Sequence, residues 1–88
     1  MVNVYDISFP LVVGAGATVT IRGAFIQGFI CTTTGTITIN RTEANGSSTT
    51  LINALPVTAG QWVDIPMYLG INGGTIVSAA AVGTLMTS

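Results

Sequence analysis

Residues Gly23 to Arg41 read GAFIQGFICTTTGTITINR, and this stretch decides the fold. In its second half, Ile37 and Ile39 alternate with threonine and asparagine. This period of two predicts a β-strand with one face in the core and one in water. The first half is apolar on both sides, which predicts a strand buried on both faces, and Gly28 within it predicts a bulge or a bend. Folded against each other, the two halves predict a hairpin that seeds a β-sandwich.

The segments on either side predict further short strands. Residues 2–9 form a first strand that Pro10 ends or pushes to a sheet edge. More strands are predicted over residues 17–22, 49–55, 61–69 and 75–85, with turn residues between them, among them Asn45-Gly46. No stretch has a 3.6-residue period, and the alanine-rich residues 78–81 are too short to nucleate a helix. The sequence therefore predicts an all-β fold over residues 1–88, a small antiparallel β-sandwich of about seven or eight strands with jelly-roll-like topology, and a small barrel is the alternative. Residues 1–10 form either an edge strand or an N-terminal arm.

The composition predicts a chain that associates. Two arginines and three acidic residues are the only charged side chains among 88, and the net charge is −1, whereas about a quarter of the residues in an ordinary domain are charged. A chain of this length buries only about 60–65% of its surface, so its core is thin. Cys31 is the single cysteine, which rules out a disulfide within the chain. Lysine, the usual guard of sheet edges, is missing. We therefore expect partner subunits, and edges covered by loops or by neighbouring subunits.

The same composition disfavours several classes of function. Without histidine, Cys31 and the serines have no usual general base, and the acids Asp6, Glu43 and Asp64 are far apart in sequence. We expect no enzyme activity, no catalytic residue, no cofactor and no metal site. Two arginines cannot form the basic stripe that nucleic acids require, and the apolar runs are shorter than the roughly 20 residues of a membrane helix. The N-terminus lacks the pattern of a secretory signal, so we expect synthesis in the cytoplasm.

Two groups of apolar residues are candidate contact surfaces. The predicted interface residues are Phe9, Leu11, Val12, Val13, Trp62 and Tyr68. Trp62 and Tyr68 fall on the same face of their predicted strand, and aromatic residues are enriched at the centres of protein interfaces. A sugar-stacking platform is the alternative for this pair. That alternative predicts an exposed aromatic residue with asparagine, aspartate and glutamine side chains in one concavity.

Three motifs resemble those of the minor structural proteins of tailed-phage virions. They are TIRGAFI at residues 20–26, AGQWVDIP at residues 59–66 and NGG at residues 72–74. Within that group the chain is most similar to the small capsid decoration, or cement, proteins. The resemblance implies a non-enzymatic protein on the capsid surface of the virion, made in the host cytoplasm. It would form a homo-oligomer, with a trimer favoured, and stabilise the shell by binding the major capsid protein or other virion proteins.

One departure from the family concerns attachment. Some decoration proteins reach the shell with a long N-terminal arm, and here residues 1–10 are the only candidate. The resemblance also leaves an alternative role open, that of a carbohydrate-binding or adaptor β-module of a phage tail or head fibre.

Overall fold

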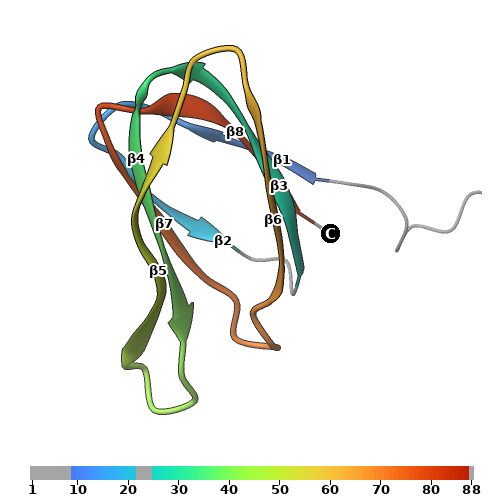
Figure 1. Cartoon of the computed structure of the whole chain (residues 1–88). Coiled ribbons are helices and arrows are strands. Elements are labelled where there is room, and N and C mark those ends of the chain that lie inside the picture. Colours follow the sequence, from blue (N-terminus) through green and yellow to red (C-terminus); the bar gives the residue numbers. More distant parts are fainter. Residues whose placement is uncertain (1–8, 22–24, 88) are drawn as a thin grey trace, which may run out of the picture.

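Two four-stranded antiparallel sheets pack face to face in the computed structural model, which describes residues 9–21 and 25–87 (Figure 1). The strands are β1 (Phe9–Val13), β2 (Thr18–Ile21), β3 (Phe25–Thr33), β4 (Gly35–Thr42), β5 (Ser48–Val57), β6 (Trp62–Tyr68), β7 (Gly74–Ala79) and β8 (Val82–Thr87). One sheet has the order β1-β8-β3-β6 and the other β2-β7-β4-β5. This is the strand order of a jelly roll. The predicted all-β sandwich with jelly-roll-like topology is confirmed.

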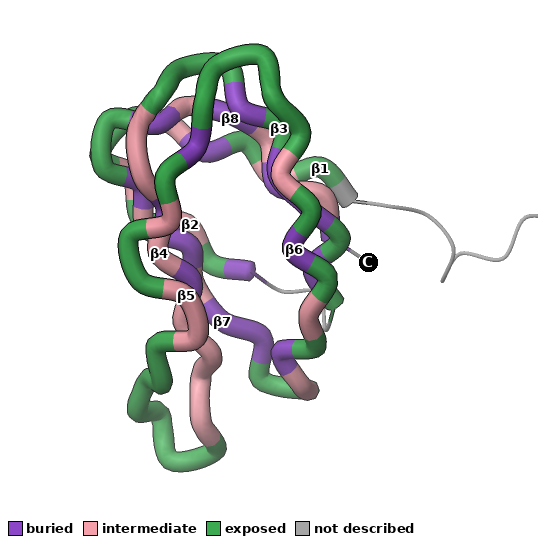
Figure 2. The backbone as a smooth tube through the Cα atoms, viewed as in Figure 1, coloured by how far each residue is buried: buried purple, intermediate pink, exposed green. Residues whose placement is uncertain are grey.

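The core lies between the sheets, because each strand turns alternate apolar residues inward. Figure 2 shows buried and exposed positions alternating along the strands. Phe29 is the largest of the fully buried side chains, and Ile37, Ile39 and Leu85 are also fully buried. Cys31 is a free, buried cysteine.

The predicted hairpin between the two halves of residues 23–41 is wrong. β3 pairs with β6 and β8, whereas β4 pairs with β5 and β7, so the two strands lie in different sheets. Only Thr34 separates them, and it carries the chain across the sandwich rather than into a two-residue turn. β3 is also not buried on both faces, because Phe25 and Ile30 are about half exposed. Gly28 does mark a bulge, since the register of β3 shifts between Ile26 and Gly28.

The predicted strand over residues 75–85 is two strands in different sheets. β7 ends at Ala79 and β8 begins at Val82. Between them Ala80 has a φ of 65°, a left-handed conformation that turns the chain toward the other sheet. No glycine or asparagine marks this corner, which is why the sequence pattern did not reveal it. The predicted first strand, residues 2–9, lies almost wholly outside the described residues, and β1 begins at Phe9.

Proline guards the sheet edges in place of lysine. Pro10 lies inside β1, an edge strand, and this is the edge position that the sequence predicted as the alternative to ending a strand. Pro56 and Pro66 lie inside β5 and β6. These are all the prolines of the chain, and each lies in an edge strand. The remaining edge strand, β2, has only four residues. Because proline cannot donate a backbone hydrogen bond and short strands pair weakly, the edges are poor sites for adding another strand.

Candidate binding surface

The outward face of the β2-β7-β4-β5 sheet, here called the polar face, is a ladder of hydrogen-bonding side chains. Thr20, Thr75, Asn40 and Thr50 lie opposite one another in register across its four strands. The amide of Asn40 donates to the Thr75 hydroxyl at 3.3 Å and accepts from the Thr50 hydroxyl at 2.8 Å. These groups satisfy one another, so the polar face is suited to contact with water.

The outward face of the other sheet, here called the apolar face, is chemically different. Five large exposed hydrophobic residues belong to its strands, namely Val12, Phe25, Ile30, Trp62 and Tyr68. Val12 pairs with Thr84, Thr84 with Ile30, and Ile30 with Trp62. We call these four residues the apolar row. Directly opposed side chains in a sheet are about 5 Å apart, so the apolar row crosses the sheet from one edge to the other.

The predicted interface residues of β1 divide between the two sides of the sheet. Val13 is fully buried, and Leu11 is half-buried and packs against the core, so both point inward. Val12 is 73% exposed and points outward. Phe9 is the first residue of β1, opposite Thr87. The period of two within a strand prevents residues 9–13 from forming one continuous outer patch, and only Val12 of these valines is available for contact.

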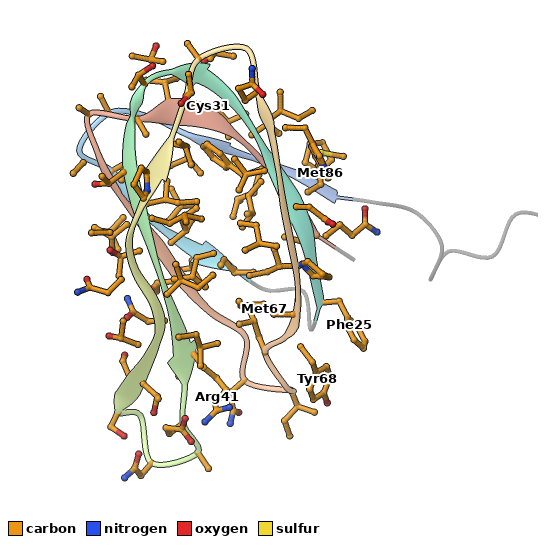
Figure 3. The ribbon with its side chains drawn as sticks, viewed as in Figure 1. Phe25, Cys31, Arg41, Met67, Tyr68 and Met86 are labelled. Carbon is orange, nitrogen blue, oxygen red and sulfur yellow. The ribbon has the colours of Figure 1, made fainter. Side chains whose placement is uncertain are left out.

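Trp62 and Tyr68 both point outward from β6, the opposite edge of the same sheet. Their side chains are 49% and 57% exposed, while Ile65 between them is buried. Tyr68 lies opposite Phe25 of β3, with ring centroids 4.9 Å apart and ring planes inclined at 52°. Figure 3 shows Phe25 and Tyr68 projecting together from the ends of β3 and β6. Their role as protein contacts stays a prediction.

A shallow hollow of about 650 Å³ lies over this end of the apolar face, here called the aromatic hollow. Its lining residues come from β3 and β6: Phe25, Ile26, Gln27, Trp62, Asp64, Pro66, Met67 and Tyr68. Sequence reasoning placed Trp62 and Tyr68 on one face of β6 but gave no indication that β3 supplies the facing wall. The hollow therefore contains an aromatic cluster, one carboxylate and one side-chain amide.

Gly28 provides the seat for Trp62. A Cβ atom on Gly28 would lie 2.3 Å from Cζ2 and 2.6 Å from Cη2 of Trp62, so the benzene half of the indole occupies the space where any other side chain would stand. The bulge at Gly28 was predicted, but its partner lies 34 positions away in sequence. One side of the indole is thus covered by the β3 backbone, while about half of the side chain stays exposed to solvent.

The described residues have one ion pair, at the end of the β4–β5 hairpin. Nε of Arg41 donates to Oε1 of Glu43 at 2.8 Å, and the Thr49 hydroxyl donates to the same oxygen at 2.9 Å. The hydrogen bond from Arg41, followed by that from Thr49, holds the pKa of the Glu43 carboxyl below its ordinary value. Arg41 and Glu43 neutralise each other beside the polar Asn45-Gly46 turn, so neither side chain offers an unpaired charge to a ligand.

Arg41→Gln is expected to raise the pKa of Glu43 back toward its ordinary value, and Thr49→Val is expected to raise it less. Because the folded-state pKa is lowered, the stabilisation by the ionised carboxylate is present above the ordinary glutamate pKa and is lost as the pH falls through the lowered pKa. A carbon-13 NMR titration of the Glu43 carboxyl group measures this shift. An identical titration curve in Arg41→Gln would mean that the ion pair does not form in solution.

Neither a metal-binding cluster nor a membrane-crossing helix occurs in the part of the chain that the structure describes. They contain no cluster of three or more histidine, cysteine, aspartate or glutamate side chains that could hold a metal ion. Within the same residues there is no helix with the length and apolarity that crossing a membrane requires. What the apolar face can supply is apolar contact, aromatic stacking and hydrogen bonds to the carboxylate of Asp64.

Comparison with protein-family models, with curated proteins and with solved structures found no match for this chain. The resemblance to tailed-phage virion proteins stays a prediction, and the surface itself has to carry any functional argument.

Proposed function

We propose that this chain is a non-enzymatic structural protein of a tailed-phage virion, which binds the capsid shell as a homo-oligomer and stabilises it. The observation that supports this proposal best is the apolar row, which runs from edge to edge of one sheet. Its aliphatic members, Val12 and Ile30, are 73% and 45% exposed. An exposed apolar strip of this extent on a thin β-sandwich is typical of a contact surface. The row offers the aliphatic surface for packing against other virion proteins.

The contacts run through the sheet face rather than through strand pairing at the edges. The missing lysine predicted that loops or neighbouring subunits cover the sheet edges, whereas prolines in three edge strands and the short length of the fourth protect them. The apolar face, in contrast, leaves large apolar side chains exposed to solvent. We therefore assign the subunit and shell contacts to Val12 and Ile30 on the apolar face.

The size of the apolar face favours repeated weak contacts. Four strands spaced about 4.8 Å apart, with five to nine residues each at about 3.3 Å per residue, give roughly 400–450 Å². A stable pairwise interface needs about 800 Å² from each partner. One such face is too small for a tight dimer on its own. On a repeating shell, an oligomer makes many copies of the contact at once, and their effects combine through multivalency.

The double variant Val12→Thr, Ile30→Thr is expected to weaken assembly by about tenfold or more. It replaces two exposed apolar side chains, whose burial in the contact would contribute about 1.5–3 kcal/mol each, by hydroxyl-bearing ones. Light scattering on a size-exclusion column would show a shift toward the 9.0 kDa monomer. Co-sedimentation with purified capsid shells of the parent virus would show reduced binding. Thr18→Ser, an exposed change on the polar face, is the matched control. A wild-type protein that is monomeric and does not bind shells would contradict the proposal.

A further inference from the structure

We propose that the aromatic hollow is a binding site for a neutral carbohydrate chain that lies along β6 from Trp62 to Tyr68. This site goes beyond the proposed structural function and uses the β6 half of the apolar face, whereas assembly is assigned to Val12 and Ile30. Its three components are a seated indole, a second aromatic cluster and a carboxylate between them.

Trp62 forms the first stacking platform. Its ring is seated against the backbone of Gly28, in space that exists only because residue 28 lacks a Cβ. A pyranose ring presents a face of C–H groups, and these groups pack favourably against the electron-rich face of an aromatic ring. Because the indole is held before a ligand arrives, binding loses little side-chain freedom.

Tyr68 and Phe25 form the second platform at the other end of the hollow. Tyr68 is six residues beyond Trp62, an even separation that places both rings on the same face of β6. At about 3.3 Å per residue, the two positions are roughly 20 Å apart. The contact with Phe25, at 4.9 Å between ring centroids, supports the Tyr68 ring. A single sugar is too short to reach both rings, so the ligand is an oligosaccharide.

Asp64 supplies the polar contact between the two platforms. It is exposed, lines the hollow and lies between the two rings on the same face of β6, two residues from Trp62. Arg41 is the one cation among the described residues, and it is paired with Glu43. The carboxylate of Asp64 is therefore available to accept hydrogen bonds from sugar hydroxyls, which are donors that a carboxylate binds well. An acidic sugar would be repelled, which is why we infer a neutral chain.

The carboxylate also argues against a protein partner at this half of the face. Charged residues are depleted at the centres of protein interfaces, and covering Asp64 with apolar side chains would bury a charge without a partner. A carbohydrate brings its own hydroxyl groups and leaves one side of the site in water. The volume of about 650 Å³ is within the range of small-ligand sites, about 300–1,000 Å³.

The test uses the intrinsic fluorescence of the full chain, because Trp62 is its only tryptophan. Cellohexaose, chitohexaose and mannohexaose serve as neutral probes, and hexagalacturonic acid serves as the acidic counterpart. We expect a saturable change in Trp62 emission with at least one neutral hexasaccharide and none with the acidic one. The disaccharide of the same sugar is expected to bind at least about tenfold more weakly, because it reaches one platform only.

Variants separate this site from the assembly surface. Asp64→Asn and Tyr68→Ala are each expected to weaken binding of the neutral probe by about tenfold or more. Val12→Thr, at the far edge of the sheet, is expected to leave binding of the sugar unchanged even where it weakens assembly. An emission change that persists undiminished in Asp64→Asn and Tyr68→Ala would overturn the proposal. So would the absence of any change with all three neutral probes, or a change only on addition of capsid shells, which would assign Trp62 to a protein contact.

Discussion

Phe29→Ala is expected to lower the free energy of unfolding by about 3–5 kcal/mol, the usual result of removing a large buried aromatic side chain. Phe29 is fully buried and is the largest such side chain. It lies on β3 between Leu85 of β8 and Val63 of β6, so its loss leaves a cavity beneath the centre of the β1-β8-β3-β6 sheet. Domains of this length are stable by only about 4–13 kcal/mol. The variant is therefore expected to lose about a quarter or more of its stability.

Urea unfolding followed by far-ultraviolet circular dichroism measures this difference. Ile30→Ala is the matched control, since Ile30 is the next residue in the same strand but points outward and is 45% exposed. Its loss is expected to be below about 1 kcal/mol. If Phe29→Ala is already unfolded without urea, the substitution lowers the free energy of unfolding by at least the whole value measured for the wild-type protein. Equal losses in the two variants would contradict the assignment of Phe29 to the inner face of β3.

The faces of individual strands could be predicted from the sequence, because the period of two is a local property. Ile37 and Ile39 are fully buried, and Thr38 between them faces outward, as the pattern indicated. The same reasoning placed Trp62 and Tyr68 on the outer face of their strand, where the structure has them. The turn at Asn45-Gly46 was also found from its residues, and Gly46 has a φ of 88°.

The pairing of strands could not be predicted, because in a jelly roll most partners are distant in sequence. Among the described residues β4 and β5 are the only consecutive strands that pair, whereas β1 pairs with β8 and β2 with β7. The alternation of apolar and polar residues within one strand does not indicate which other strand pairs with it. The apolar first half of residues 23–41 appeared to be buried on both sides because one of its faces belongs to the exposed apolar face. The corner at Ala80 could not be predicted either, because its left-handed conformation is not marked by a glycine or an asparagine.

The candidate site was predictable only in part for the same reason. Trp62, Asp64 and Tyr68 share one strand, so their common face follows from alternation. The other wall of the hollow, with Phe25 and the bulge at Gly28, comes from a strand that joins β6 only in the folded chain. The aromatic hollow has one wall from β6 and one from β3, and the sequence identified only the wall from β6.

Gly83→Ala is expected to lower the free energy of unfolding by about 3 kcal/mol, the upper part of the usual range for overpacking. A Cβ atom at Gly83 would lie 2.2 Å from the Ile30 carbonyl oxygen and 2.5 Å from Cζ of Phe29. The first of these atoms is backbone of the neighbouring strand and cannot rotate away. To relieve the overlap, β8 has to move away from β3, and the paired residues Cys31 and Gly83 separate.

Gly14→Ala is the control for this substitution, measured by the same urea unfolding. Gly14 has no atom within 4 Å of an added Cβ and does not have a left-handed backbone, so alanine is expected to be neutral or to stabilise by up to about 1 kcal/mol. Equal stability of the two variants would contradict the close approach of β8 and β3. Because Thr84, the next residue, joins Val12 to Ile30 in the apolar row, a displaced β8 also breaks the row in the middle. Gly83→Ala is therefore expected to weaken the proposed assembly more than Val12→Thr or Ile30→Thr alone. It would do so by displacing β8, without changing any exposed side chain.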